Sequence, residues 1–531
     1  MGVMMTDWGI PGAFAFIGVA FVGWNLALGA NVTALPTAGR TFRVLTGLCA
    51  FLLIPALVIG LLAPTAAGAR ILGPLAWLWP VVVAGVAVQA LWALGGGRTS
   101  AAVALPIALY DLVVAWVTVT RWIEGQGALL PAWTLAPGMA VSTIGATVLG
   151  DDAFLWSAAV LVPLLVPAAP ARAPLSGAWR AVVATGCLAV VVLVGAETSS
   201  AFGAISAARV LGTGTMPERA RPEFAVGLRL FGTLDGTPSS AVARHDVALA
   251  DSLGITAVHL ELGPEGAPAA ALDSIARSIE ARRDSLVLVV TLDMARGDRG
   301  ALRTDDAWLR ARLALIEQIV RHLNPDVLLP ADGVASPSDA GAVRWWQSYY
   351  ERAARSARRI DRDVSIALGT DAGTAADSAL CDWVMQGGSP VDVVALLVRP
   401  HGGMPSRLTG ALAAVTRWAS LARAAPSVWL MAVPASPAVA GEVAQQRLVR
   451  HALQWGASRT WVRGVIAGDA SDVLSITGLR TATGRSRGAL AEVGTALRSL
   501  RDTPVVAPIP ADSAATDTLH STPAPHSPIR P

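Results

Sequence analysis

The spacing of apolar residues divides the chain into two parts. Up to about residue 200, apolar runs follow one another at about the 20-residue length that a helix needs to cross roughly 30 Å of hydrocarbon. We expect membrane spans at 9–30, 44–63, 71–95, 99–120, 153–170 and 178–197. The stretch 129–150 contains Pro131 and Pro137 and stays open as a seventh span, a re-entrant turn or an interfacial segment. The pattern predicts an α-helical transmembrane bundle of about six helices over 1–200.

From residue 222 onward, short β-rich runs alternate with amphipathic helical stretches. Strands are expected at 224–231, 255–262, 286–293, 326–332, 364–371, 391–399, 427–434 and 460–467. The helices that follow them are expected at 239–253, 267–283, 305–323, 339–359, 375–387, 405–424, 438–456 and 486–502. Alternation of this kind indicates a parallel sheet, and eight units match a (β/α)8 TIM barrel over 222–502. A doubly wound sheet is the competing fold, but no G-x-G-x-x-G turn follows the first strand.

Composition narrows the class further. Hydrophobic residues make up 53% of the 531 residues and charged residues 15%, which excludes a disordered chain. The net charge is +3 and neither half is strongly basic, so we expect no nucleic-acid partner. Three cysteines cannot form a disulfide framework. Residues 201–221 are expected to be a linker, and 503–531, rich in Pro, Ala, Ser and Thr, a disordered tail.

The arginines of the first part indicate how it crosses the membrane. With six spans and the amino terminus outside, the inner loops hold Arg40, Arg43, Arg98, Arg172 and Arg180, and the outer loops hold Arg70 and Arg121. This distribution follows the positive-inside rule. It predicts a multi-pass protein of the inner (plasma) membrane, in contact with the lipid bilayer, whose barrel is extracytoplasmic.

An acidic residue, Asp111, lies in the middle of the predicted span 99–120. An intramembrane carboxyl group is a candidate for a proton or ion path, which would make the bundle a transporter or lipid-handling unit. The alternative is that Asp111 forms interhelical hydrogen bonds with Asn25 and Gln89. Both interpretations stay open here.

Polar residues gather where the predicted barrel strands end, which is where barrel enzymes carry their chemistry. They are Asp235, His259, Glu261, Asp293, Asp332, Asp371, Arg399, His401 and Asp469. Strand 7 ends in AVPASP and offers no acid before Glu442. Alternation along the strands points His259 and Glu261 into the barrel with Arg229. An Arg229–Glu261 pair would be either a structural ion pair or part of a catalytic site.

These residues limit the chemistry of the barrel. Glycoside hydrolysis needs two carboxyl groups, and Asp332, at the end of strand 4, is the best single acid. No His-x-His pair, G-x-S-x-G elbow, P-loop or H-E-x-x-H motif occurs, so we expect neither a metal nor a cofactor. Trp345, Trp346, Tyr349 and Tyr350 could stack on a sugar or pack a helix on the barrel. Trp418, Trp429 and Trp455 are expected in the core.

Three stretches carry a resemblance to a known superfamily. They are NPDVLLPADG (324–333) with WWQSYYERAARSARRIDRDVSIAL (345–368), SPVDVVALLVRPHGG (389–403), and GEVAQQRLVRHALQWGASRTWVRGV (441–465) with GLRTATGRSRGAL (478–490). The second part of the chain resembles the glycoside hydrolase superfamily of TIM barrels, in its broad retaining clan. That clan uses a Glu after strand 4 as acid/base and a Glu after strand 7 as nucleophile. Here Asp332 stands at the first position, Ala331 replaces the usual Asn, and strand 7 has no carboxylate.

Together with the predicted spans and topology, the resemblance implies a membrane-anchored extracytoplasmic barrel that acts on or binds a cell-envelope or extracellular glycan or polysaccharide. If it is an enzyme, Asp332 works with Asp469, Glu261 or Asp293. Substrate contacts are expected from His259, Asp293, Asp371, Arg399, His401, Trp346 and Tyr349. The alternative is a catalytically inactive barrel that binds a glycan or a protein on a membrane platform.

Overall fold

The structure, a computed structural model, describes most of both parts of the chain. It covers residues 19–29, 39–63, 69–96, 100–125, 136–137, 140–141, 161–166, 177–234, 236–238, 240–294, 306–333, 340–372, 375–397, 404–422, 427–431, 442–472, 478–481 and 484–502. Asp235, Arg399, His401, the end of strand 7 and the predicted tail 503–531 lie outside these residues, as does most of 129–150.

Four helices of the first part are long and apolar enough to cross a membrane. They are α2 (Arg40–Leu62), α4 (Leu78–Gly95), which the short helix η1 (Gly73–Leu75) precedes, α5 (Ala101–Gly125) and α8 (Gly177–Val210). A short helix α3 (Ala69–Leu72) precedes η1, and a shorter apolar helix covers Val19–Gly29. The expected helices at 44–63, 71–95, 99–120 and 178–197 are confirmed, and by their length and composition they indicate a multi-pass membrane protein.

The expected helix at 153–170 is wrong for residues 161–166, which are non-helical and fully buried in the bundle. Side chains of neighbouring helices satisfy the backbone of this segment. The Asn25 amide donates to the Pro163 carbonyl (2.7 Å) and accepts from the Leu165 N–H (2.7 Å), and Gln89 makes the same pair of bonds with Val166 (both 3.0 Å). Asp111 Oδ1 accepts from the Leu164 N–H (2.8 Å). Non-helical backbone at membrane depth is tolerated only where it is satisfied in this way.

The second part is a closed barrel of eight parallel strands in the order β1 to β8. The strands are β1 (Ala225–Leu234), β2 (Ala257–Leu262), β3 (Val287–Leu292), β4 (Val327–Leu329), β5 (Ser365–Thr370), β6 (Val393–Leu397), β7 (Val428–Met431) and β8 (Val462–Asp469). The helices around it are α9 (Ser240–Leu253), α10 (Ala269–Ile279), η2 (Glu280–Ser285), α12 (Asp306–Leu323), α13 (Ala340–Ile360), α14 (Ala375–Met385), α15 (Met404–Leu421), α17 (Glu442–Ala457) and α18 (Gly488–Asp502). The predicted (β/α)8 barrel is confirmed.

Two apolar layers hold the barrel together. The larger lies between strands and helices, and the smaller fills the barrel with mostly small residues such as Ala225, Ala257 and Ala367 around Trp429. Gly464 on β8 makes room for the Trp429 ring, because an added Cβ would lie 2.6 Å from it. The expected core positions of Trp418, Trp429 and Trp455 are confirmed, since all three are buried.

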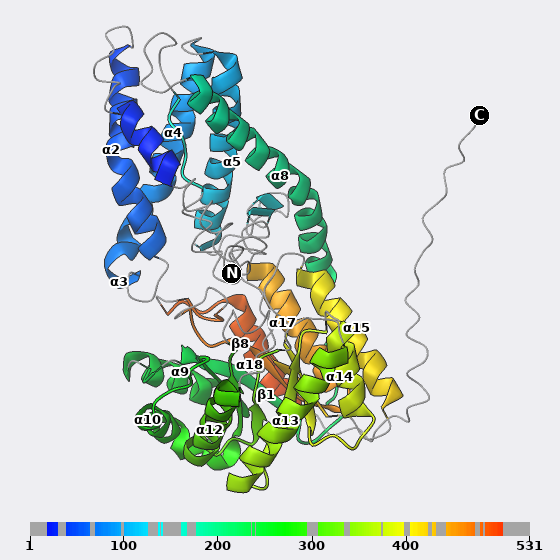
Figure 1. Cartoon of the computed structure of the whole chain (residues 1–531). Helices are drawn as coiled ribbons and strands as arrows, with labels where there is room; N and C mark the ends of the chain where they lie inside the picture. Colours follow the sequence, from blue (N-terminus) through cyan, green and yellow to red (C-terminus); the bar gives the residue numbers. More distant parts are fainter. Residues whose placement is uncertain are drawn as a thin grey trace, which may run out of the picture.

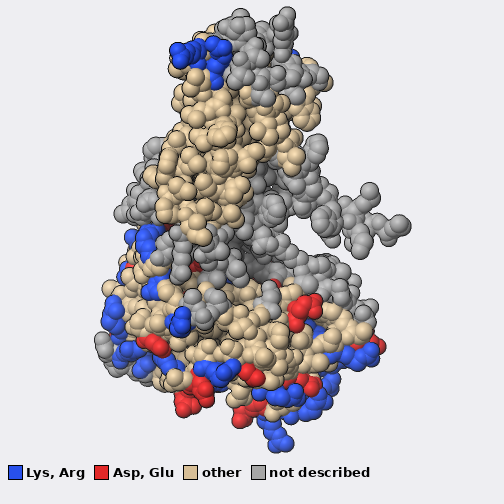
Figure 2. All heavy atoms as spheres, turned by 90° about the vertical axis from the view of Figure 1, so that its left-hand side faces the viewer, with Lys and Arg blue, Asp and Glu red and all other residues tan. Residues whose placement is uncertain are grey.

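The membrane helices stand on one side of the barrel, and α8 runs from them down to α15 and α17 (Figure 1). Figure 2 shows acidic and basic side chains mixed over the barrel surface, whereas the visible face of the membrane region is uncharged except for a basic cluster at its far end. An uncharged band of this kind suits contact with hydrocarbon. The boundaries of the predicted linker stay a prediction, but the structure continues α8 through residue 210.

Candidate functional site

The centre of the candidate site is Arg229, in the middle of β1, between two acids at the carboxyl ends of β2 and β8. The Arg229 guanidinium bonds Glu261 through Nη1 and Asp469 through Nε. Thr233 Oγ1 donates to the other Glu261 oxygen (2.8 Å). Exposed fractions are 17% for the Arg229 side chain, 20% for Glu261 and 5% for Asp469, so two of the three reach the barrel mouth. The structure thus brings Glu261 and Asp469 together.

Two strand irregularities make this arrangement possible. The β1–β2 register jumps from Arg229 opposite His259 to Thr233 opposite Glu261, and Phe231 has a φ of 67°. The β1–β8 register jumps from Gly227 opposite Ile466 to Arg229 opposite Asp469, so an extra residue turns Asp469 inward. Bulges of this kind re-aim side chains and are common beside active sites. The Phe231 N–H donates to the buried Asp246 Oδ2 (2.9 Å), which anchors the β1 bulge.

His259 lies on the inner face of β2, below Glu261, as alternation predicted. Its Nε2 is 2.9 Å from Thr291 Oγ1 on β3, and its Nδ1 is buried without a hydrogen-bond partner among the described residues. Burial lowers the pKa of this imidazole to about 4, against the opposing effect of Glu261. His259 is therefore neutral at pH 7 and presents one unused polar atom to the barrel interior.

Asp332 lies beyond the end of β4 and is 7% exposed. Its Oδ1 accepts from the Met294 N–H (2.9 Å), which also reaches Asp293 Oδ1 (2.8 Å). The described contacts thus fix Asp332 against the end of β3. Its catalytic role stays a proposal.

A buried arginine behind this region is a residue that the sequence analysis missed. Arg312 of α12 donates to the carbonyls of Leu292 (2.7 Å), Pro330 (2.9 Å) and Pro264 (3.1 Å). It thereby ties together the ends of three neighbouring strands. The signal was present, because Arg312 stands four residues before the buried Ile316 on the apolar stripe of the helix.

The remaining expected contact residues lie in different places. Asp371 is exposed just past β5. Trp346 and Tyr349 are each 1% exposed and pack between α13 and the barrel, and the Tyr349 hydroxyl donates to the Pro330 carbonyl (2.7 Å). These contacts support the packing interpretation of the aromatic cluster.

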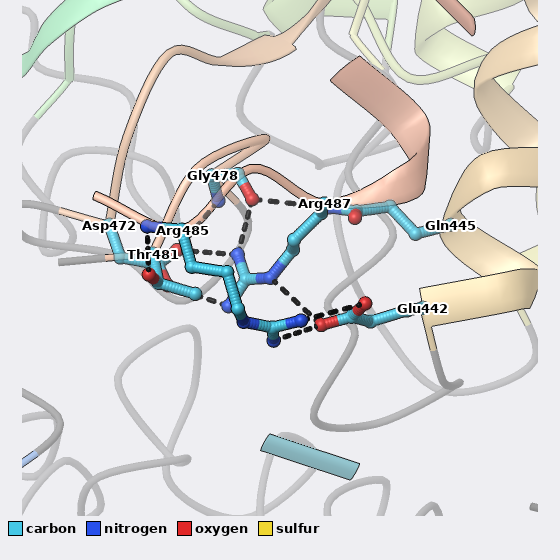
Figure 3. A network of polar contacts seen from close by, with 7 residues as sticks. All are labelled: Glu442, Gln445, Asp472, Gly478, Thr481, Arg485 and Arg487. Carbon is cyan, nitrogen blue, oxygen red and sulfur yellow. Dashed lines mark hydrogen bonds and ion pairs between the residues drawn. The ribbon is translucent and has the colours of Figure 1, made fainter. Parts of the chain in front are cut away.

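A second polar network holds the chain that follows β8 (Figure 3). Asp472 accepts two bonds from Arg487 (3.0 and 2.7 Å) and one from the Gly478 N–H (2.9 Å). Glu442, the first acid after strand 7, forms ion pairs with Arg485 and Arg487. Burial raises the pKa of the Asp472 carboxyl, although Arg487 and the Gly478 N–H act in the opposite direction. The ion pairs with Arg485 and Arg487 hold the Glu442 carboxylate against this loop.

Chemically, the arrangement offers fixed hydrogen-bonding groups. Within the residues that the structure covers, no group of three or more His, Cys, Asp or Glu could hold a metal ion. In the same residues, the buried His259 Nδ1 has no hydrogen-bond partner. One guanidinium between two carboxylates leaves a net negative charge at the mouth. A site with these charged and polar groups can bind a polar ligand that carries several hydrogen-bond donors and acceptors.

Comparisons with known proteins bear on the second part of the chain. No family model matches, and no curated protein matches either. Among solved structures, the chain is similar to a monomeric beta-xylosidase from Caulobacter crescentus CB15, with 11% identity, a TM-score of 0.39 and coverage of 52% of this chain and 69% of that one. A GH5_18 protein from Streptomyces cattleya in complex with Manb1-4GlcNAc has 17% identity, a TM-score of 0.41 and coverage of 53% and 82%. The beta-glucuronidase of Bifidobacterium dentium has 12% identity, a TM-score of 0.40 and coverage of 53% and 47%. These similarities concern the fold alone.

Proposed function

We propose that the protein is a membrane-anchored barrel that binds a carbohydrate at its mouth through Arg229, Glu261 and Asp469. The observation that carries the proposal is the bridged triad of Arg229, Glu261 and Asp469, beside which the buried His259 Nδ1 has no hydrogen-bond partner among the described residues. A buried polar atom without a partner marks a place where water or a ligand completes the hydrogen bonding.

Carbohydrate is proposed as the ligand class because of the sequence resemblance. Sugar hydroxyls both donate and accept, so they can bond a carboxylate and a guanidinium at the same time. Binding is favoured over hydrolysis because the acids near the mouth already hold structural partners. Glu261 and Asp469 bind Arg229, Glu442 binds Arg485, and residues 432–441 contain no acid.

Hydrolysis is the second candidate function, and Asp332 supports it. Its carboxyl group lies at the end of β4 and is held by a backbone N–H, as a positioned acid would be. It would need a second carboxyl group about 5–9 Å away across the sugar, and Asp469 or Glu261 is proposed for that role.

The test is a glycan array on the full chain in nanodiscs, with parallel assays for released sugar. We expect binding without release of sugar. Glu261→Gln should weaken binding at least about tenfold, which corresponds to about 1.4 kcal/mol, because it alters the bridge to Arg229. Asp332→Asn and the surface variant Arg359→Met should bind like the wild type. Release of sugar that Asp332→Asn abolishes would establish the second candidate, and absence of binding to any glycan would refute the proposal.

A further inference from the structure

A single helix connects the membrane to the barrel. α8 is 34 residues long, and Glu197 is the first acid in the helix, inside the stretch Gly177–Ala207 that is apolar enough to cross a membrane. We take this residue as the edge of the hydrocarbon. Residues 197–210 then extend at most about 21 Å beyond it, at about 1.5 Å per residue. The helix therefore sets a short distance between the bilayer and the barrel.

The chain that leaves α8 is bonded along α17. Gln454 donates to the carbonyls of Gly214 (2.6 Å) and Thr215 (3.0 Å), and Arg450 also donates to Gly214 (2.9 Å). Farther along, the Ala220 N–H donates to the Ala457 carbonyl (2.8 Å). This segment is thus part of the barrel surface, and the barrel does not swing on a free tether.

The path of the segment after α8 shows which end of the barrel is turned toward the membrane helices. Glu442, the first residue of α17, follows β7 and lies at the mouth, whereas Ala457 precedes β8 and lies at the opposite end. The segment meets α17 near Arg447, where an added Cβ on Gly212 would be 2.6 Å from the Arg447 carbonyl, and leaves at Ala457. It therefore runs away from the mouth, so the mouth is the end turned toward the membrane helices (Figure 1).

We infer that the ligand of the mouth is a saccharide linked to a lipid of the same membrane. The inference rests on the proposed function and adds where the ligand comes from. A mouth that faces the bilayer across at most about 21 Å meets the saccharide of a glycolipid directly. Attachment to the same membrane also makes binding effectively intramolecular, which raises apparent affinity by about a hundredfold or more over the free sugar.

The orientation can be tested without any glycan. The three native cysteines are buried, so a fluorophore can be attached selectively to an introduced cysteine. Ser486→Cys labels an exposed position beside α18 at the mouth, and Arg362→Cys labels an exposed turn before β5 at the opposite end. The full chain is placed in phosphatidylcholine nanodiscs that contain an acceptor-labelled phosphatidylethanolamine.

Energy transfer to the lipid should be clearly stronger from position 486, because a six-residue strand alone separates the two ends by about 20 Å. Equal transfer, or stronger transfer from position 362, would overturn the inference and would leave the proposed function untouched.

The second arm tests the ligand itself. A neoglycolipid set, made from oligosaccharides coupled to dipalmitoyl phosphatidylethanolamine, is placed in the same discs as the protein, and the same oligosaccharides are added free in solution. We expect the lipid-linked oligosaccharide to half-saturate the protein at an effective concentration at least about a hundredfold lower than the free oligosaccharide does. The Glu261→Gln variant should lose this binding. Equal binding of free and linked forms would refute the membrane-linked ligand but support a carbohydrate site. Binding of neither form would refute the proposed function and the inference together.

Discussion

Replacing Arg229 by methionine tests whether the charge at the barrel mouth is organised as described. The substitution keeps the volume of the side chain but leaves Glu261 and Asp469 facing each other without a cation. Removing one partner of a buried ion pair costs about 3–5 kcal/mol. Because the Arg229 and Glu261 side chains are 17% and 20% exposed, water screens part of the repulsion, and we expect about 3 kcal/mol.

The assay is thermal unfolding of the full chain in nanodiscs, followed by near-ultraviolet circular dichroism. A loss of about 3 kcal/mol corresponds to a fall in Tm of roughly 6–10 °C for a domain of this size. The deficit should shrink as the pH falls, because protonation of either carboxyl group removes the repulsion. The matched control is Arg359→Met, which breaks the ion pair of an arginine that is 67% exposed and should cost less than about 1 kcal/mol.

A second variant makes the result specific to the triad. Adding Glu261→Gln and Asp469→Asn to Arg229→Met removes both unpaired charges and should restore most of the lost stability. The reasoning would be refuted if Arg229→Met behaved like Arg359→Met, or if the triple variant were no more stable than the single one.

Three further variants test other parts of the structure. His259 has a pKa of about 4 in the folded state and about 6.5 in the unfolded state, so below about pH 6.5 only the unfolded state binds this proton. The free energy of unfolding should therefore fall by up to about 1.4 kcal/mol for each pH unit between pH 6.5 and pH 4. The His259→Gln variant should lack this pH dependence. Arg312→Met should destabilise the barrel by about 3 kcal/mol in a denaturant series because several strand-end carbonyls lose their donor, whereas the exposed Arg310→Met on the same helix should not. Asn25→Ala removes two hydrogen bonds to the 161–166 backbone and should lower the stability of the bundle in detergent by about 2–3 kcal/mol, measured by thermal unfolding. The control is Leu26→Ala, at an exposed position on the lipid side. An equal loss of stability in the control would contradict the role of Asn25 in holding this backbone.

The (β/α)8 barrel could be predicted from the sequence because each of its units repeats a short β-rich run followed by an amphipathic helix. Strand alternation predicted that His259 and Glu261 point inward, and the expected helix 305–323 buries the apolar residues Ile316 and Ile319, which lie three positions apart. What periodicity could not give is the bulge that turns Asp469 toward Arg229, because an inserted residue changes the parity of a strand without changing its composition.

The membrane part shows a different limit. Hydropathy reports that 161–166 is apolar enough to be buried, but it does not distinguish a helix from an extended segment. The distinguishing signals were Pro163 and the polar side chains of Asn25, Gln89 and Asp111 on other spans. They point to backbone groups that lack a partner within their own segment. In the structure, Asn25, Gln89 and Asp111 form hydrogen bonds with this backbone, and Gln89 also donates to Thr46 Oγ1 of α2 (3.4 Å).

If the polar mouth formed by β1, β2 and β8 holds a carbohydrate, as we propose, the ligand must protect the backbone of these strands. Hydrogen–deuterium exchange on the full chain in nanodiscs, with and without a saturating glycan from the array, measures this protection. We expect slower exchange in 229–234, 257–262 and 466–472 and unchanged exchange in the turns at the opposite end, such as 361–364. Protection confined to the outer helices, or unchanged exchange at β1, β2 and β8 with the glycan bound, would contradict it.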